Sequence, residues 1–309
     1  MIEIKGKNGI SAKIVADSVS KTGVRMVTME LEYPRFILSE MNTHRMLSKN
    51  SASSRAIPVN RMIELINENP AIPVHWGKNQ SGMVAQESLP EFTQRAVQAA
   101  WLAAKDYALS VVRVLSDSGL HKQVANRVSE PWQRMKTVIS GTEWANLLWL
   151  RDHADAQPEF AELASCIRQV MESSNPVLLH PHEWHLPYIA TSRLDTGEVV
   201  YLDTNGERLS LSDAVKISTS CCAQVSYRRL DDSKAKALDI YEKLIGADRK
   251  HFSPFEHQAT PMFSSINARN FINQPTVGVT HADKWGNVWS GNFRGWIQHR
   301  KILEENFEI

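Results

Sequence analysis

Side chains that can bind an anion are concentrated between residues 43 and 55. This stretch contains one histidine, two arginines and four serines. Arginine presents a planar fork of N–H donors that can bind a phosphate or the carbonyl groups of a pyrimidine, and serine hydroxyls can bind the remaining oxygens. From the residues alone, the stretch is either an anion-binding site or a basic loop in contact with solvent.

The same stretch resembles the signature motif of flavin-dependent thymidylate synthases. In that motif, Arg-His-Arg is followed after seven residues by serine and, two residues further, by arginine. Two positions differ from the family. Thr43 stands where the first arginine would be, and Ser51 stands where the family usually has glutamate after asparagine, here Asn50. The residues that match the motif are His44, Arg45, Ser53 and Arg55.

Two more parts of the chain resemble elements of this family. The first consists of short stretches in the order found in the family, namely Ala125-Asn126-Arg127, Pro131, Asn146, Leu150-Arg151 and Ala156-Gln157-Pro158-Glu159. The second consists of Ala223–Tyr227 and His251–His257, which resemble Ala-Arg-Val-Ser-Tyr and Ser-Pro-Phe-Glu-His elements. In the family these two elements precede Arg-His-Arg, whereas here they follow it, so the chain looks circularly permuted or rearranged. The resemblance covers about residues 24–60, 122–172 and 217–260.

The resemblance implies reductive methylation of dUMP at C5. Methylenetetrahydrofolate would supply the carbon unit, FAD would be the bound cofactor and NADPH the reductant. Such chemistry depends on orientation and electrostatics more than on a covalent protein group. The family is also tetrameric, so the resemblance implies a homotetramer whose active sites lie between subunits.

Site residues follow from the same resemblance. Arg151 would be the catalytic residue, because it would stabilise negative charge on the uracil ring. From its own surroundings, Arg151 would instead be a helix-surface arginine paired with Asp152 or Glu159. The implied substrate-binding residues are Glu40, Ser51, Ser53, Ser54, Arg55 and Arg127. The implied flavin-binding residues are Thr43, His44, Arg45, Asn50, Asn146, His251 and Ser253.

Other functions stay open at this point. The differences at Thr43 and Ser51 allow a related deoxypyrimidine-nucleotide C5-hydroxymethylase. Three histidines and a glutamate within residues 180–185 could hold zinc or iron, although Pro181 disrupts helical geometry there. Tryptophans with interleaved arginines could bind nucleic acid, against which the near-zero net charge argues. These residues are Trp132, Trp144, Trp149, Trp285, Trp289, Trp296, Arg294 and Arg300.

Periodicity predicts the elements that would position these residues. Alternation over 25–33 predicts a half-buried strand, and Pro34 predicts a helix through 35–45. The Ser- and Asn-rich stretch 48–54 is predicted to be a loop. Apolar residues at three- and four-residue steps over 90–118 predict a long core helix. Further helices are predicted over 60–67, 142–153, 158–173 and 232–244, and Asn205-Gly206 predicts a hairpin between 199–202 and 208–211.

Length and composition restrict the class of protein. A chain of 309 residues with 42% hydrophobic residues can bury a full core, which excludes a disordered tail or a fibre. The net charge of +1 gives no field that would attract nucleic acid or a membrane. The three cysteines have no CxxC spacing, so we expect reduced structural thiols and no thiolate nucleophile.

We therefore expect one α+β domain over residues 1–309. It would contain a mixed sheet packed with long helices, followed by an irregular C-terminal extension over about residues 260–309. No apolar run is long enough for a membrane span and the N-terminus lacks the apolar run of a signal peptide, so the expected location is the cytoplasm.

Overall fold

A six-stranded sheet lies at the centre of the computed structural model, which describes residues 2–226, 231–273 and 275–305. Five strands follow the order β1-β2-β3-β5-β4, and β6 pairs with the far end of β2. Only the β2–β6 pair is parallel among these pairs, so the sheet is mixed, as expected. The strands are β1 (Glu3–Lys5), β2 (Ser11–Ser20), β3 (Arg25–Pro34), β4 (Ser48–Ser51), β5 (Arg134–Gly141) and β6 (Val177–Leu179), and the 3-10 helix η1 (Lys7–Gly9) links the first two.

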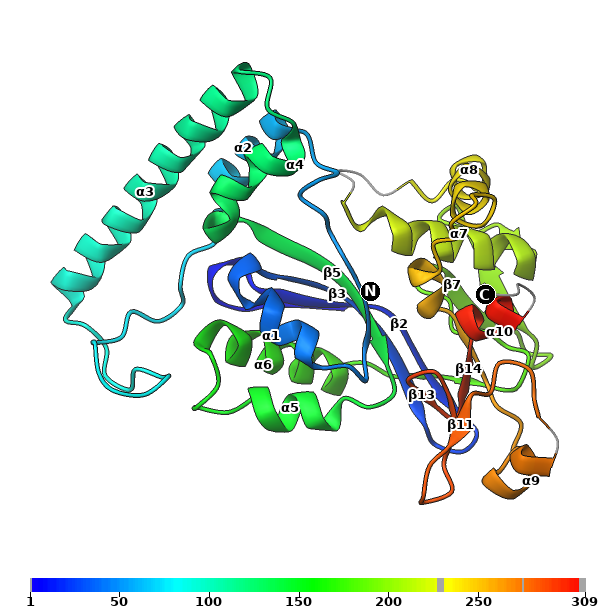
Figure 1. Ribbon diagram of the computed structural model, residues 1–309. Coiled ribbons are helices and arrows are strands. Elements are labelled where there is room, and N and C mark those ends of the chain that lie inside the picture. The colour runs from blue at the N-terminus through cyan, green and yellow to red at the C-terminus, as the bar shows by residue number, and fades with distance from the viewer. Residues whose placement is uncertain (1, 227–230, 274, 306–309) are drawn as a thin grey trace.

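Strand β3 confirms the predicted alternation, but both of its faces are covered. Met29 and Leu31 are buried beneath helices, and Met29 is opposite Ile139 of β5. Thr28, on the other face, is also fully buried. That face is covered by the C-terminal third of the chain (Figure 1). The strand is therefore more buried than the half-buried strand that the alternation predicted.

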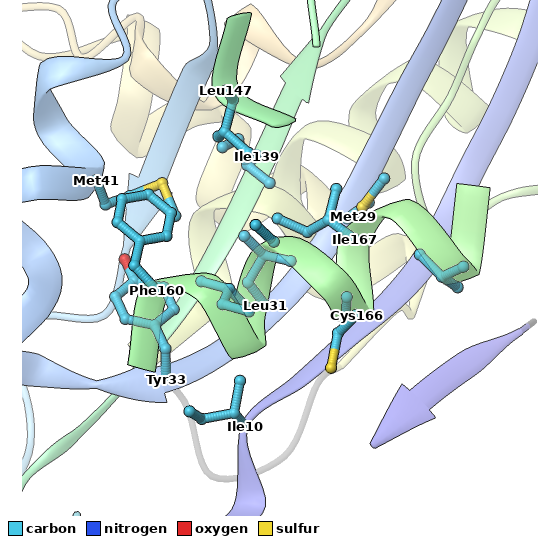
Figure 2. Packing of buried hydrophobic residues seen from close by; sticks show 14 of the residues in the cluster. Ile10, Met29, Leu31, Tyr33, Met41, Ile139, Leu147, Phe160, Cys166 and Ile167 are labelled. Carbon is cyan, nitrogen blue, oxygen red and sulfur yellow. The ribbon is translucent and has the colours of Figure 1, made fainter. Parts of the chain in front are cut away.

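Three helices cover the first face of the sheet and form the main apolar core. Phe160 and Ile167 of α6 lie against strand residues such as Leu31 (Figure 2). Burying each of these large side chains contributes about 1.5–3 kcal/mol relative to leaving it exposed. The helices are α1 (Leu38–Thr43), preceded by η2 (Arg35–Ile37), α5 (Ala145–Arg151) and α6 (Pro158–Glu172). The predicted helix over 35–45 thus exists in two short parts and ends before His44.

Helix α3 (Glu91–Asp117) exists as predicted, but it is not a core helix. It extends along the margin of the molecule (Figure 1). Within it only Ala108, Leu109 and Val112 are buried, whereas Phe92 is 85% exposed. It packs with α2 (Val59–Glu68), α4 (Lys122–Ala125) and η3 (Asn126–Trp132) through a small separate core.

The C-terminal third of the chain adds a second layer on the other face of the sheet (Figure 1). The predicted hairpin and the helix at 232–244 are present, whereas α7 was not predicted. The elements of this layer before residue 258 are β7 (Ala190–Arg193), β8 (Val199–Leu202), β9 (Arg208–Leu209), α7 (Leu211–Ala223), η4 (Gln224–Ser226), α8 (Lys234–Ile245) and η5 (Ser253–Glu256).

The segment after residue 258 differs from the irregular extension that we expected. Its short strands β10 and β14 pair with each other, and Trp296 is fully buried beside Met26 of the central sheet. These contacts tie the segment to the central sheet. Its elements are β10 (Ala259–Pro261), α9 (Ala268–Asn273), β11 (His281–Ala282), β12 (Val288–Ser290), β13 (Phe293–Arg294), β14 (Trp296–Gln298) and α10 (His299–Glu305).

The stretch 48–54, predicted to be a loop, begins with strand β4. Its backbone pairs with β5, where Ser51 lies opposite Thr137 and Ser48 opposite Ser140. Polar composition favours a loop, but pairing along an existing strand satisfies the same backbone groups. The helices in the described part of the chain include none with the length and apolarity needed to cross a bilayer.

The three cysteines are free and buried, in agreement with the expected structural thiols. Burial raises the pKa of Cys166 to about 11 and that of Cys221 to about 12. Burial also raises the pKa of Cys222 well above its ordinary value. None of these thiols is therefore activated as a thiolate at neutral pH.

Candidate functional site

Arg151 is held in place by two residues from different parts of the chain. It lies at the end of α5, and its Nε donates a hydrogen bond to Nε2 of His44 at 3.0 Å. Its guanidinium carbon lies 4.8 Å from the centre of the Phe160 ring, against which the His44 ring also packs edge to face. A hydrogen bond and a cation–π contact together fix the plane of the guanidinium group.

The surface ion pairs considered for Arg151 are wrong. Asp152 pairs with Arg168 at 2.6 Å. Glu159 is buried, and its carboxylate accepts from the backbone N–H of Val74 and from the side chain of Gln157. Arg151 therefore keeps donors available on its Nη atoms.

His44 is neutral in this arrangement. Burial, followed by the charges of Arg151 and Lys49, lowers the pKa of His44 to about 4. Its Nε2 can accept the Arg151 hydrogen bond only when that nitrogen is unprotonated, which places the proton of the neutral ring on Nδ1. Helix α1 ends immediately before His44, so the change of backbone direction turns the imidazole toward α5.

Glu40 contributes an acceptor beside the same arginine. Its Oε2 lies 3.9 Å from Nη1 of Arg151, which is an ion pair without a direct hydrogen bond. This oxygen is shielded from solvent and has no hydrogen-bond partner within the described residues. The Glu40 side chain is nevertheless 36% exposed and that of Arg151 21%, so a ligand can reach the exposed part of a pair that combines a carboxylate acceptor with N–H donors.

Asn126 fixes the C-terminal end of the 43–55 stretch. The side chain of Asn126 donates to the carbonyl oxygens of Ser54 and Ile57, at 2.8 and 3.0 Å. These bonds fix the backbone that carries Arg55, whose side chain is exposed and has no ion pair within the described residues. Arg127, next to Asn126, is exposed and pairs with Glu130.

A hydrogen bond connects β4 to the end of α7, directly before the family-like stretch Ala223–Tyr227. The side chain of Asn50 donates to the carbonyl oxygen of Cys222 at 2.9 Å, one residue before Ala223. Ser51, which replaces the family glutamate, shares the Thr137 hydroxyl with Tyr33 inside the sheet. The Ser51 side chain is thus hydrogen-bonded within the protein, and Tyr227 of this stretch lies outside the described residues.

The remaining predicted residues have no hydrogen bond or ion pair with Arg151 in the described part of the chain. Thr43 donates to the carbonyl oxygen of Glu40 at the end of α1. Arg45 and Asn146 are exposed, and Arg45 has no ion pair among the residues that the structure describes. His251 precedes η5 and Ser253 begins it; both are exposed, and η5 packs against β4. The predicted site therefore divides into a group around Arg151, a group around Arg55, and a group at η5.

Two open cavities lie next to these groups. One, of about 490 Å³, is lined by Ala52 and Ala56 and by Arg134 and Lys136 of β5. Sequence reasoning missed these two cations, although their spacing of two residues would place them on one face of a strand. Their charges are matched by Glu32 and by Glu30, but Nη2 of Arg134 is buried without a partner within the described residues.

The second cavity, of about 610 Å³, is next to the group around Arg151. It is lined by Ser39, which precedes Glu40, by Gln157 and Glu159, and by the aromatic rings of Phe36 and Trp101. Both cavities have the volume typical of small-molecule sites. Each adjoins one of the stretches identified in the sequence.

The residues considered for a metal site or for nucleic-acid binding make other contacts in the described part of the chain. Among the described residues, no group of three or more His, Cys, Asp or Glu side chains is placed to hold a metal ion. His185 is buried within hydrogen-bond distance of Ser18 and Thr28, and Glu183 pairs with Arg193. The tryptophans proposed for nucleic acid are mostly core residues, because four of the six are buried, namely Trp132, Trp144, Trp289 and Trp296.

Comparisons with known proteins find similarity to solved structures but none to protein families or curated sequences. No protein-family model matches the sequence, and no curated protein matches it. The chain is similar to a solved structure of the UMP/dUMP methylase PolB from Streptomyces cacaoi bound with 5-Br UMP. The two chains are 16% identical, the TM-score is 0.45, and the match covers 57% of this chain and 92% of that one. This degree of similarity assigns neither a family nor an activity to the chain.

Proposed function

We propose that this protein is a flavin-dependent thymidylate synthase-like enzyme that methylates dUMP at C5. Methylenetetrahydrofolate would supply the carbon unit and NADPH the reducing equivalents. The observation that supports the proposal is that all three stretches that resemble the family meet at residues 44–54. Asn126, Arg151 and Cys222 are far apart in the sequence, yet each is hydrogen-bonded to this segment.

The residues present fit two anionic ligands, with Arg45 available to the flavin nucleotide and Arg55 to the dUMP phosphate. Arg45 precedes β4 in the sequence and Arg55 follows it. Both side chains are exposed and have no ion pair within the described residues. Unpaired guanidinium groups are suitable partners for a diphosphate or a monophosphate. When bound, the flavin would supply the redox chemistry that no amino-acid side chain provides.

The group around Arg151 would bind and polarise the pyrimidine. Uracil presents an N–H donor between two carbonyl acceptors, and the Glu40–Arg151 pair presents an acceptor beside donors. Negative charge that develops on the ring as C5 becomes nucleophilic would be stabilised by the guanidinium group. His44 and Phe160 would keep that group from turning away.

Flavin retention and nucleotide turnover test this proposal. The purified protein is incubated with FAD, passed through gel filtration and examined for a visible flavin band. The loaded protein is then assayed for dUMP-dependent oxidation of NADPH in the presence of methylenetetrahydrofolate. The mass of the nucleotide product distinguishes methyl transfer from hydroxymethyl transfer. Loss of the flavin band on gel filtration, together with no change in dUMP, would overturn the proposal.

The resemblance also predicts a homotetramer. Light scattering coupled to size-exclusion chromatography measures the mass in solution, with and without FAD. A mass four times that of the chain is expected, and a monomer at micromolar concentration would be evidence against sites between subunits.

A further inference from the structure

A continuous chain of five polar side chains crosses the interior of the protein. Ser18 Oγ lies 2.9 Å from Nδ1 of His185, whose Nε2 lies 2.8 Å from Thr28 Oγ1. Thr28 Oγ1 lies 2.6 Å from Ser140 Oγ, which lies 2.8 Å from Nδ1 of His257. All five residues are at most 5% exposed. None of them belongs to the groups around Arg151 or Arg55.

Sheet pairing and the C-terminal layer bring these residues together. Thr28 and Ser140 are register partners on β3 and β5, on the face that the C-terminal layer covers. His185 is fixed there by backbone hydrogen bonds in both directions with Ala259. The indole of Trp296 packs edge to face against the His185 ring. The five hydrogen-bonded side chains therefore lie at the interface between the sheet and its second layer.

Both imidazoles are neutral, because burial lowers the pKa of His185 and that of His257 to about 3. A neutral imidazole carries one proton, so one ring nitrogen donates and the other accepts. Each hydroxyl between them has a single hydrogen to donate. These limits leave few ways to place the protons along the chain.

In two arrangements all four hydrogen bonds form and the Thr28 and Ser140 hydroxyls, which are fully buried, each donate one of them. The only hydroxyl hydrogen that can then lack an acceptor among the five side chains is that of Ser18, which is 5% exposed. In the first, His257 Nδ1 donates to Ser140, Ser140 to Thr28, Thr28 to His185 Nε2, and His185 Nδ1 to Ser18. In the second, every bond runs in the opposite direction, and both rings carry their proton on Nε2. If the two rings adopted different tautomers, lone pairs of Thr28 and Ser140 would face each other, or the hydroxyl hydrogen of one of these two fully buried residues would lack an acceptor among the five side chains.

We infer that the five side chains form a proton relay that locks the two histidines into the same tautomer. Conversion of the first arrangement into the second moves one proton across each of the four hydrogen bonds. Water would supply the proton taken up at His257 Nε2 and would accept the one released from the Ser18 hydroxyl, so the five side chains hold the same number of protons in both arrangements. The relay thus decides whether His257 Nε2 is an acceptor or a donor.

His257 Nε2 is the open end of the relay. It is buried and has no hydrogen-bond partner within the described residues. His257 directly follows η5, and the carbonyl oxygen of Glu256 accepts from Gln298, which also donates to Ser48 of β4. The relay therefore ends beside the segment that carries Ser253. Its existence does not rest on the proposed function, although that function would give it a use.

Histidine tautomers measured by NMR test the relay. The full-length chain is labelled with 15N-histidine, and long-range proton–nitrogen spectra report which ring nitrogen carries the proton. We expect His185 and His257 to show the same tautomer. Opposite tautomers in the wild-type protein would overturn the inference. His281, on an exposed hairpin, is an internal reference.

Variants at Thr28 test the coupling between the rings. Thr28→Val removes the central hydroxyl with little change of shape. It should change the tautomer populations of His257, whose hydrogen bond is to Ser140 and not to Thr28. Thr28→Ser should restore them. If Thr28→Val leaves His257 unchanged, the rings are not coupled.

If Thr28→Val does not fold, Ser140→Ala is used instead. It should change the tautomer populations of His185, and an unchanged His185 would show that the rings are not coupled. None of these measurements uses turnover, so failure of the proposed methylation would not alter their outcome.

Discussion

The position of Arg151 depends on a neutral histidine. Its Nε bonds to His44, whose pKa of about 4 keeps the imidazole unprotonated throughout the neutral range. The same imidazole was expected to contact flavin, but the Arg151 bond occupies its Nε2. A residue assigned to a cofactor by resemblance thus has a structural role toward the proposed catalytic group.

Arg151→Ala should abolish dUMP turnover without loss of flavin binding. Removing a donor that stabilises developing charge typically lowers kcat by about 100-fold or more. Rate assays and the retained flavin spectrum measure the two properties. Arg168→Ala is a matched control, because Arg168 lies in the neighbouring helix and pairs with Asp152. Unchanged turnover in Arg151→Ala would remove this residue from its proposed role.

Arg55→Ala should weaken dUMP binding. A charge-assisted hydrogen bond is worth about 1.5–3 kcal/mol, which corresponds to a roughly 10- to 150-fold increase in Kd. Isothermal titration calorimetry measures the affinity. Arg113, exposed on α3, provides the control Arg113→Ala. Equal affinity of the wild type and Arg55→Ala would contradict the assignment of a phosphate site.

At the scale of elements, helices α3 and α6 have similar patterns but different surroundings. Both have apolar residues at helical spacing, and both begin after a polar segment with a proline at or next to the first position. The apolar side of α6 is buried against the sheet, whereas most of the apolar side of α3 is exposed. Periodicity identifies an apolar stripe, but it does not identify what covers the stripe.

Two phenylalanines in the first turns of these helices test this difference. Phe160→Ala should lower the free energy of unfolding by about 3–5 kcal/mol, because it leaves a cavity in the core. Phe92→Ala should change it by less than about 0.5 kcal/mol, because Phe92 is exposed in the chain. Chemical denaturation measures both values. A similar loss in the two variants would show that Phe92 is covered in solution.

For the whole molecule, the two faces of the sheet differ in chemistry. The face under α6 is an apolar core, whereas the face under the C-terminal layer contains hydroxyl, amide and imidazole groups. Buried polar groups are stable only when they are hydrogen-bonded, so the second layer must dock in one defined register.

Stability should therefore fall as the pH is lowered below about 6.5. Burial lowers the pKa of His185 and His257 to about 3 in the folded chain, whereas the unfolded chain has a value near 6.5. Between these values the unfolded state binds more protons, so each histidine can reduce stability by up to about 1.4 kcal/mol per pH unit. Denaturation curves between pH 7.5 and 5 measure this slope. His257→Gln should reduce it, and equal slopes would contradict the prediction.

The sequence by itself determined the local elements and the residues worth testing. The strand at 25–34 and the helices at 59–68 and 158–172 follow from periodicity, because the side chains of one element repeat with its backbone geometry. The resemblance identified His44 and Arg151 without any indication that they touch. Both results depend on short segments of chain, which is why they could be obtained without coordinates.

Only the tertiary structure decided how these parts are used. The polar stretch 48–51 becomes a strand because β5 offers it a partner, and α7 was not recognised from the sequence. The Arg151–His44 bond and the chain from His185 to His257 join residues that are distant in sequence. Such contacts arise from the docking of layers, and docking is determined by the burial of whole faces rather than by any local pattern.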